Sequence, residues 1–244
     1  MKRRAVVDRP GRRPPASPAR GAGNTLPRKQ RLTWLVPVGL VLLGIVPIVS
    51  GSARMVELWG GPAVLRVNPG YVASPVPVIV HIVCASLYAI LGAFQFAAGI
   101  RRRRPGWHRG AGRLLVLLGL AVALSALWLN QFHARPESNE LLYLFRLVFA
   151  SAMLASIAVG FTAIRRRDVT RHRTWMTRAY AIALAAGTQA FTLGIGATVF
   201  GTGELSTALL SGAGWALNLT VAEWAIRKNR APRSHTPGRH AQHS

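Results

Sequence analysis

Histidine is the residue type in this chain best suited to chemistry inside a membrane. Four histidines stand within or beside long apolar runs: His81, His108, His133 and His172. Neutral imidazole is a common axial ligand of haem iron, and ionisable groups within a bilayer are costly enough that each is a functional candidate. His108 and His172 fall at one end of the runs, and His81 and His133 at the other. One hypothesis is therefore an electron-transfer protein that binds b-type haem through one histidine pair at each membrane face.

The two histidine pairs differ in how well they are placed to hold an iron. About 25 residues of predicted helix separate His108 from His133, so these two cannot share one haem. His133 stands beside Arg135-Pro136 in a predicted loop, and a loop holds a ligand less rigidly than a helix does. We therefore expect the pair of His108 and His172 to be the stronger one.

Arginine is the second residue type in this chain that could bind a ligand, because its planar guanidinium group binds phosphate and carboxylate groups. The pairs His108-Arg109 and His172-Arg173 each precede a further arginine that begins an apolar run. Such arginines would hold haem propionates or, in a cofactor-free protein, the phosphates of anionic lipid headgroups. The candidate anion-binding residues are Arg109, Arg113, Arg146, Arg173 and Arg178.

Arg146 differs from the other candidates because it lies inside an apolar run. Three roles fit this position. The side chain pairs with an acid, extends to the membrane surface, or neutralises an anionic ligand group near His81. The acids within reach of such a pairing are Glu57, Glu137 and Glu140.

A polar stripe follows one face of the second apolar run. His81, Tyr88 and Gln95 are spaced by sevens, and Cys84 and Gly92 fall on the same face. A polar face in a membrane helix turns toward the bundle interior. This stripe is either part of a ligand site or a set of hydrogen bonds between helices.

Hydrolytic and metal chemistry find little support in the sequence. No Ser-His-Asp set, carboxylate pair or phosphate-binding Gly-rich loop is visible. Cys84 and His81 supply only two zinc ligands, so we predict no metal site and no catalytic residue. An enzyme with this sequence would be a membrane oxidoreductase. The alternative to haem binding is a cofactor-free transporter subunit, lipid-headgroup binder or assembly partner.

Charge and apolarity together predict the elements that position these residues. The chain carries 31 Lys and Arg against 7 Asp and Glu, yet 50% of its residues are hydrophobic. A membrane-spanning helix needs about 20 apolar residues, and basic residues are retained on the cytoplasmic side. Alternating basic blocks and apolar runs predict an all-α bundle of six membrane helices with both termini cytoplasmic. The predicted spans are 32–50, 76–100, 114–132, 141–164, 178–199 and 207–226.

Basic tails flank the predicted membrane domain of residues 32–226. Residues 1–31 are rich in Arg, Pro and Gly and are predicted to be disordered, and residues 227–244 form a second basic tail. Because the charge is divided among tails and connections, we expect no nucleic-acid partner. The expected partners are the lipid bilayer, anionic headgroups, and either a redox protein or a second copy of the chain.

A faint repeat organises the middle of the chain. Residues 101–113 and 165–178 each contain an Arg run, a His-Arg pair and an Arg that starts the next apolar run. This repeat predicts two similar helical hairpins that form a four-helix core, with the first and last spans beside it.

Several short sequence motifs in this region are similar to those of a known family. They are His81, residues 92–96, His108-Arg109 with Gly112-Arg113, and residues 172–180 with the pattern His-Arg-x-Trp-Met-x-Arg. In these motifs the chain resembles bacterial predicted membrane proteins of domain-of-unknown-function family 2306, over residues 75–192. The resemblance implies a multi-pass protein of the bacterial cytoplasmic membrane and no particular activity. Family members often carry a further Arg near Thr188-Gln189-Ala190, where this chain has none, so no role is carried over there.

Overall fold

The computed structural model describes residues 28–62, 64, 69–133 and 139–230, and these residues form helices and no strands. The helices are α1 (Arg28–Leu58), α2 (Pro69–Ala73), α3 (Pro75–Gln95), α4 (Ala98–Arg103), α5 (Pro105–Phe132), α6 (Glu140–Arg165), α7 (Val169–Ala183), α8 (Ala185–Phe200) and α9 (Glu204–Arg230). Nearly all of the two basic tails lies outside the described residues, so the predicted disorder of residues 1–31 stays a prediction.

Five of these helices, α1, α3, α5, α6 and α9, are long and apolar enough to cross a membrane. Helices α7 and α8 pass the same test when they are taken together, although the chain bends by 40° between them. If this bent pair counts as one span, the described residues form up to six spans. The prediction of an all-α, multi-pass membrane bundle is therefore confirmed. Many large side chains face outward, such as Leu117 at 66% exposure and Val221 at 63%, which is the surface that lipid tails cover.

The helix boundaries differ from the predicted spans at the Arg-rich connections. α3 ends at Gln95 rather than at residue 100, and a break at Phe96–Ala97 precedes the short α4. α5 begins at Pro105, nine residues before the predicted start, because proline is well suited to the first turn of a helix. His108 and its neighbouring arginines consequently lie on the first turns of α5 rather than in a loop.

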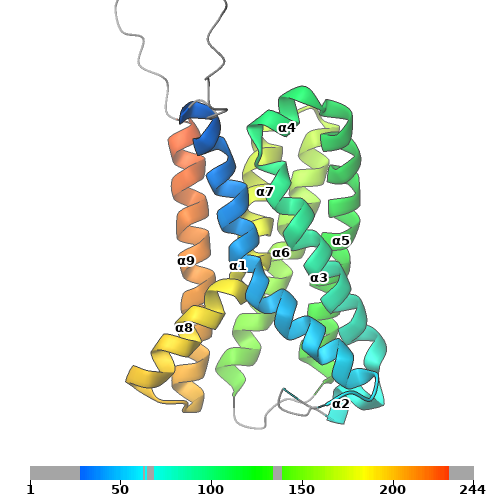
Figure 1. The fold of residues 1–244 in the computed structure, drawn as a ribbon, viewed down its shortest axis with the longest axis vertical. Helices are drawn as coiled ribbons and strands as arrows, with labels where there is room; N and C mark the ends of the chain where they lie inside the picture. Colours follow the sequence, from blue (N-terminus) through cyan, green and yellow to red (C-terminus); the bar gives the residue numbers. More distant parts are fainter. Residues whose placement is uncertain (1–27, 63, 65–68, 134–138, 231–244) are drawn as a thin grey trace, which may run out of the picture.

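The helices form a bundle in which chain neighbours pack on one another. α3 packs on α5, α5 on α6 and α6 on α7, while α1 covers α3 and α8, and α9 covers α6, α7 and α8. This packing agrees with the predicted core of two hairpins. Figure 1 shows the start of α1 and the end of α9 at the same end of the bundle as α4. We call this end, which holds α4 and the α6–α7 connection, the Arg-rich end; its cytoplasmic orientation stays a prediction.

Two tyrosines fill the middle of the core. Tyr88 and Tyr180 are buried, with ring centroids 5.8 Å apart. A Cβ atom at Gly92 would overlap the Tyr180 ring, and one at Gly119 would come within 2.8 Å of the Tyr88 ring. The Tyr180 hydroxyl donates to the carbonyl oxygen of Ala89 at 2.7 Å. Small residues thus let the helices approach closely enough for the two rings to interlock.

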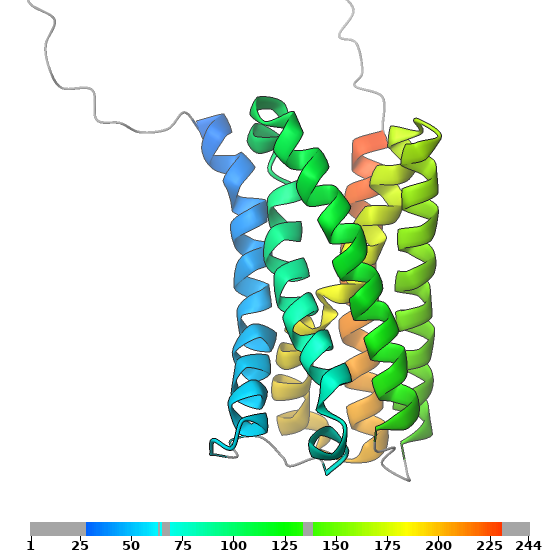
Figure 2. The same cartoon turned by 90° about the vertical axis from the view of Figure 1, so that its right-hand side faces the viewer.

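The fifth predicted span is broken at Leu184, six residues after its predicted start, where an unbroken helix was expected. α7 ends at Ala183 and α8 begins at Ala185, and α8 occupies the half of the bundle remote from α4 (Figure 2). Asn218 of α9 donates to the carbonyl oxygen of Ala181 at 3.0 Å, and its own amide oxygen accepts from Thr188 at 2.7 Å. Side-chain bonds from α9 therefore satisfy part of the backbone that the break releases.

Candidate functional site

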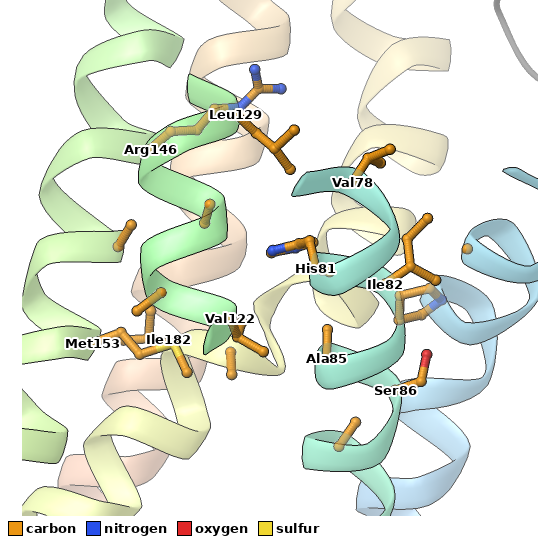
Figure 3. A pocket seen from close by; sticks show the side chains of 18 of the residues that line it. Val78, His81, Ile82, Ala85, Ser86, Val122, Leu129, Arg146, Met153 and Ile182 are labelled. Carbon is orange, nitrogen blue, oxygen red and sulfur yellow. The ribbon is translucent and has the colours of Figure 1, made fainter. Parts of the chain in front are cut away.

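A cavity of about 560 Å³ lies in the half of the bundle remote from the Arg-rich end. All the membrane helices contribute to its wall, most of the lining side chains are apolar, and many of these are alanine. Figure 3 shows His81 from α3 and Arg146 from α6 among the side chains around this space. The polar and aromatic lining residues are Tyr71, His81, Ser86, Asn130, His133, Arg146, Gln189 and Trp215.

The His81 ring is held in place by Ser125 of α5. The Nδ1 atom of His81 lies 3.0 Å from Ser125 Oγ, and this hydroxyl also lies 2.6 Å from the Ala121 carbonyl oxygen and 3.1 Å from that of Val122. The single hydroxyl proton can serve only one of these acceptors, so the direction of the His81–Ser125 bond follows the tautomer of the ring. When the hydroxyl donates to a carbonyl, Nδ1 carries the ring proton and Nε2 can accept a proton or bind a ligand.

Arg146 brings a positive charge to the same cavity. The described part of the chain holds two ion pairs, Arg54 with Glu57 at 2.5 Å and Arg178 with Glu223 at 2.5 Å, so Glu57 is already engaged. Arg146 makes no ion pair within these residues, and Glu137 lies outside them. The Arg146 side chain is exposed, and it lines the cavity. Of the three roles that fit its position, neutralising a ligand is the one that the cavity favours.

Other polar lining groups are fixed by bonds to the backbone. His133 Nε2 lies 3.1 Å from the Ser74 carbonyl oxygen, and its Nδ1 is buried without a partner among the described residues. The Asn130 amide donates to the Tyr143 carbonyl at 3.1 Å, and the Gln189 amide to the Ser211 carbonyl at 3.0 Å. These bonds orient the side chains before any ligand arrives.

The outer histidines, His81 and His133, both line the cavity but lie at different depths in the bundle. His81 stands beside Ser125 of α5, and His133 follows the end of α5, eight residues after Ser125, which is a rise of about 12 Å. Two imidazoles on one metal have nitrogens only about 4 Å apart, since each metal–nitrogen bond is about 2 Å. The structure therefore brings both residues to one cavity without placing them as the two ligands of one iron.

A family model described as "Predicted membrane protein (DUF2306)" matches residues 78–226. The chain belongs to this family. The match covers more than half of the chain and contains the cavity residues His81, Asn130, Arg146 and Gln189. No curated protein and no solved structure matches the chain. The family description names a membrane protein without an activity, so the function of this DUF2306 member has to be argued from its sites.

At the Arg-rich end of this DUF2306 protein lies the inner histidine pair, His108 on the first turns of α5 and His172 on the first turn of α7. His172 Nδ1 donates to the Gly160 carbonyl at 2.9 Å, which leaves Nε2 as the acceptor atom of its neutral ring. The Nδ1 atom of His108 is buried without a partner among the described residues. The structure thus places both histidines at the same end of the bundle. Neither histidine of this pair lines the large cavity.

The arginines at this end divide into two groups. Burial, and then the positive charges of Arg173 and Arg102, lower the pKa of the Arg101 guanidinium. Arg178 instead makes a bidentate pair with Glu223, at 2.5 and 3.1 Å, and lies over the Trp175 ring at 4.6 Å. Arg178 is therefore a neutralised link between α7 and α9, and the remaining candidates Arg109, Arg113 and Arg173 stay predictions.

Several site residues were missed because no local pattern marks them. Ser125 is one small hydroxyl within an apolar run, 44 residues from the histidine that it holds. Arg101 was one of four consecutive arginines, and only the fold distinguishes it from its exposed neighbours. Asn130 and Gln189 did carry a usable signal, since amide side chains within membrane spans turn toward protein or a cavity.

Proposed function

We propose that this DUF2306 protein binds, within the membrane, an amphiphilic molecule that carries one carboxylate or phosphate group. The anionic group is held by Arg146, His81 supplies a second polar contact, and the apolar part of the molecule occupies the rest of the cavity. The observation that carries the proposal is the accessible guanidinium of Arg146 on the wall of a mostly apolar cavity, with no carboxylate partner in the described part of the chain.

The energetics of an arginine within a membrane support an anionic ligand. A cation at this position is costly unless it is hydrated or paired, and an anion that enters the cavity supplies the missing partner. Arg binds carboxylate and phosphate through two parallel hydrogen bonds, which gives geometric selection as well as charge. The small apolar lining residues, such as Ala85 and Ala126, leave room for a tail or ring beside the anionic group.

The broken fifth span supports a ligand site at the same position. Ile182, Ala183, Leu184 and Gln189, on both sides of the α7–α8 break, line the cavity. Interrupted membrane helices are tolerated where they border a cavity, and in many transporters they form the substrate site near the bilayer midplane. This supports the cofactor-free alternative in the form of a carrier or transporter subunit.

The haem hypothesis has weaker support than the anionic ligand. The outer pair shares a roomy cavity but is separated by about 12 Å of helix rise. The inner pair lies at one end of the bundle, and the Nδ1 bond of His172 to a backbone carbonyl is typical of metal-ligating histidines, but the cavity lies elsewhere. Neither histidine pair combines two closely placed imidazoles with a cavity large enough for a haem. Binding of haem b therefore stays a prediction, which a visible spectrum can test.

Tryptophan quenching tests the proposed ligand site directly, because Trp215 lines the cavity. A dibrominated fatty acid and the matching dibrominated alcohol are titrated into protein in uncharged detergent. The signal of Trp215 is isolated by subtracting a Trp215→Phe variant. We expect the acid to quench Trp215 at lower concentration than the alcohol.

The Arg146→Gln variant should remove this preference for the acid. A charge-assisted hydrogen bond contributes about 1.5–3 kcal/mol, so binding of the acid should weaken about 10- to 100-fold. Arg103→Gln, at an exposed arginine of α4 at the opposite end, is the matched control and should leave quenching unchanged. Equal quenching by acid and alcohol in the native protein would show that Arg146 binds no anion.

A further inference from the structure

The two basic side chains of the cavity, Arg146 and His81, lie at nearly the same depth in the bundle. The hydrogen bond from the Asn130 amide to the Tyr143 carbonyl links α5 to α6. Counted from this bond into the bundle, Arg146 lies three residues along α6, and Ser125, the partner of His81, lies five residues along α5. These are rises of about 4.5 and 7.5 Å, so the two levels differ by only about 3 Å. Both side chains therefore face one part of the cavity, from two helices that each pack on α5.

The cavity has no acidic lining residue in the part of the chain that the structure describes. Its ionisable lining groups are Arg146 from α6, His81 from α3, Tyr71 from α2 and His133 just after α5. His133 lies about 9 Å from the level of Arg146, toward the end of the bundle. The His81 ring points from α3 toward the side of the cavity that holds Leu129 and Arg146 (Figure 3). Arg146 and His81 are thus the two basic groups that are placed to share one ligand group.

The charge of a ligand decides how this pair of groups is used. A mostly apolar cavity favours a filled site whose charges sum to zero, because an unbalanced charge is poorly solvated there. The guanidinium of Arg146 alone balances a monoanion such as a carboxylate. A dianion needs a second positive charge, which His81 supplies when its ring takes up one proton from water. Imidazole is the side chain that changes its charge most readily near neutral pH.

We infer that the ligand of this cavity is a phosphate monoester with an apolar tail, and that it binds with uptake of one proton, which His81 holds against the phosphate. The inference rests on the proposed function and deepens it, since it selects one kind of anion. A phosphodiester, as in common phospholipid headgroups, carries one negative charge and leaves His81 without a partner charge.

The hydrogen-bond donors around the site also favour a phosphate. Its three terminal oxygens accept from donors on different helices, whereas one guanidinium fork fills the two oxygens of a carboxylate. The Asn130 amide has two hydrogens, of which the Tyr143 carbonyl accepts one. Asn130 of α5 therefore adds a third donor beside Arg146 of α6 and His81 of α3.

Quenching of Trp215, which lines the cavity, by four dibrominated ligands of equal chain length tests the inference. Their head groups are an alcohol, a carboxylate, a sulfonate and a phosphate monoester, and the full-length protein is kept in uncharged detergent. The sulfonate is the matched control, since it has three oxygens like the phosphate but only one negative charge. At about pH 7.5 the phosphate carries close to two charges. We expect it to quench Trp215 at about tenfold lower concentration than the carboxylate or the sulfonate.

The pH dependence of quenching reports the proton. Because the complex holds one proton more than the separated partners, raising the pH from about 7.5 to 8.5 should weaken phosphate binding up to about tenfold. Binding of the carboxylate and the sulfonate should change by less than about twofold. His81→Gln keeps a side chain that can bond to Ser125 but cannot take up a proton. This variant should lose both the pH dependence and the preference for phosphate, whereas Arg103→Gln, at an exposed arginine of α4, should keep both.

The outcomes separate this inference from the proposed function. If phosphate and carboxylate quench equally, and both do so better than the alcohol, the proposed function stands and the inference is overturned. If neither anion quenches better than the alcohol, both are overturned. A pH dependence that persists in His81→Gln would assign the proton to another group and overturn the inference. If that variant does not fold, the comparison of phosphate with sulfonate in the native protein decides alone.

Inorganic phosphate distinguishes a tailed ligand from a free phosphate compound. At the concentration of the dibrominated phosphate it should not displace that ligand, because the tail contributes apolar contacts. Displacement at equal concentration would identify a free phosphate compound and overturn the inference.

Discussion

Replacing Arg146 with methionine should make the ligand-free protein more stable while abolishing anion binding. Methionine has a similar length and a flexible apolar side chain, so it can fill the space without a charge. In the ligand-free protein Arg146 has no ion-pair partner within the described residues, and it stands on the wall of a cavity among apolar side chains. A binding site that is kept ready for a ligand commonly costs stability in this way.

The expected gain follows from the depth of Arg146 in the bundle. Arginine at the centre of a membrane helix costs about 2.5–3.5 kcal/mol on insertion scales. Arg146 lies six residues after Glu140, the first residue of α6, which is a rise of about 9 Å from the end of that helix. Because the cost falls toward the interface and the cavity admits water, we expect a gain of about 1–2 kcal/mol in the free energy of unfolding.

Denaturant unfolding in one fixed detergent, followed by tryptophan fluorescence, measures this gain. Arg113→Met removes an exposed charge at the other end of the bundle and should change stability by less than about 0.5 kcal/mol. Adding the dibrominated acid should stabilise the native protein and leave Arg146→Met unaffected. If Arg146→Met instead loses more than about 1 kcal/mol without ligand, the arginine makes stabilising internal contacts and our reasoning about its role is refuted.

Three further predictions follow from the core, the α7–α9 link and the haem hypothesis. Gly92→Ala should lower the free energy of unfolding by about 1–3 kcal/mol, because the added methyl would overlap the Tyr180 ring. Gly112→Ala is the control, since there is open space around Gly112, and an equal loss of stability in both variants would contradict the packing argument. Glu223→Gln should cost about 1 kcal/mol in the same unfolding assay, since it leaves the partly exposed Arg178 unpaired; a variant as stable as the native protein would show that the link contributes nothing. If the haem hypothesis holds, visible spectra of oxidised and dithionite-reduced protein should show the sharp bands of six-coordinate haem b. Replacing both His108 and His172 with Ala should then remove the bands of one haem. A colourless protein from haem-sufficient cells would end the hypothesis.

The sequence predicted the parts of this molecule that depend on long, regular patterns. Apolar runs of membrane-spanning length gave the helices, and the seven-residue spacing of His81, Tyr88 and Gln95 identified the face that turns inward. In the structure His81 bonds to α5, Tyr88 is buried, and the Gln95 amide is enclosed. These inferences succeeded because a membrane helix has few ways to accommodate polar groups other than by facing its neighbours.

What the sequence did not predict depends on contacts between distant segments. The break at Leu184 occurs in a run without proline, so no local residue marks it, and bonds from Asn218 on α9 satisfy part of its backbone. Glu223 of α9 pairs with Arg178, which the fold presents from α7, 45 residues away in the chain. In both cases the deciding group comes from an element that lies well apart in the chain, and helical spacing alone carries no information about it.

The tyrosine layer separates the two polar regions and bears on how the protein works. His81 lies one heptad before Tyr88 on α3, and Gln95 one heptad after it, so the stripe passes from the cavity, through the aromatic layer, to the Arg-rich end. Tyr180 contacts both Tyr88 and Phe96, with ring centroids 5.8 and 5.2 Å apart, and this packing closes the centre of the core. A channel would need an open polar column at this level. A binding protein needs only the cavity, and a carrier needs in addition an element that can shift beside it. Because the α7–α8 break lies next to the cavity, where the helical hydrogen-bond ladder is already interrupted, the architecture favours ligand binding or carrier movement over a pore.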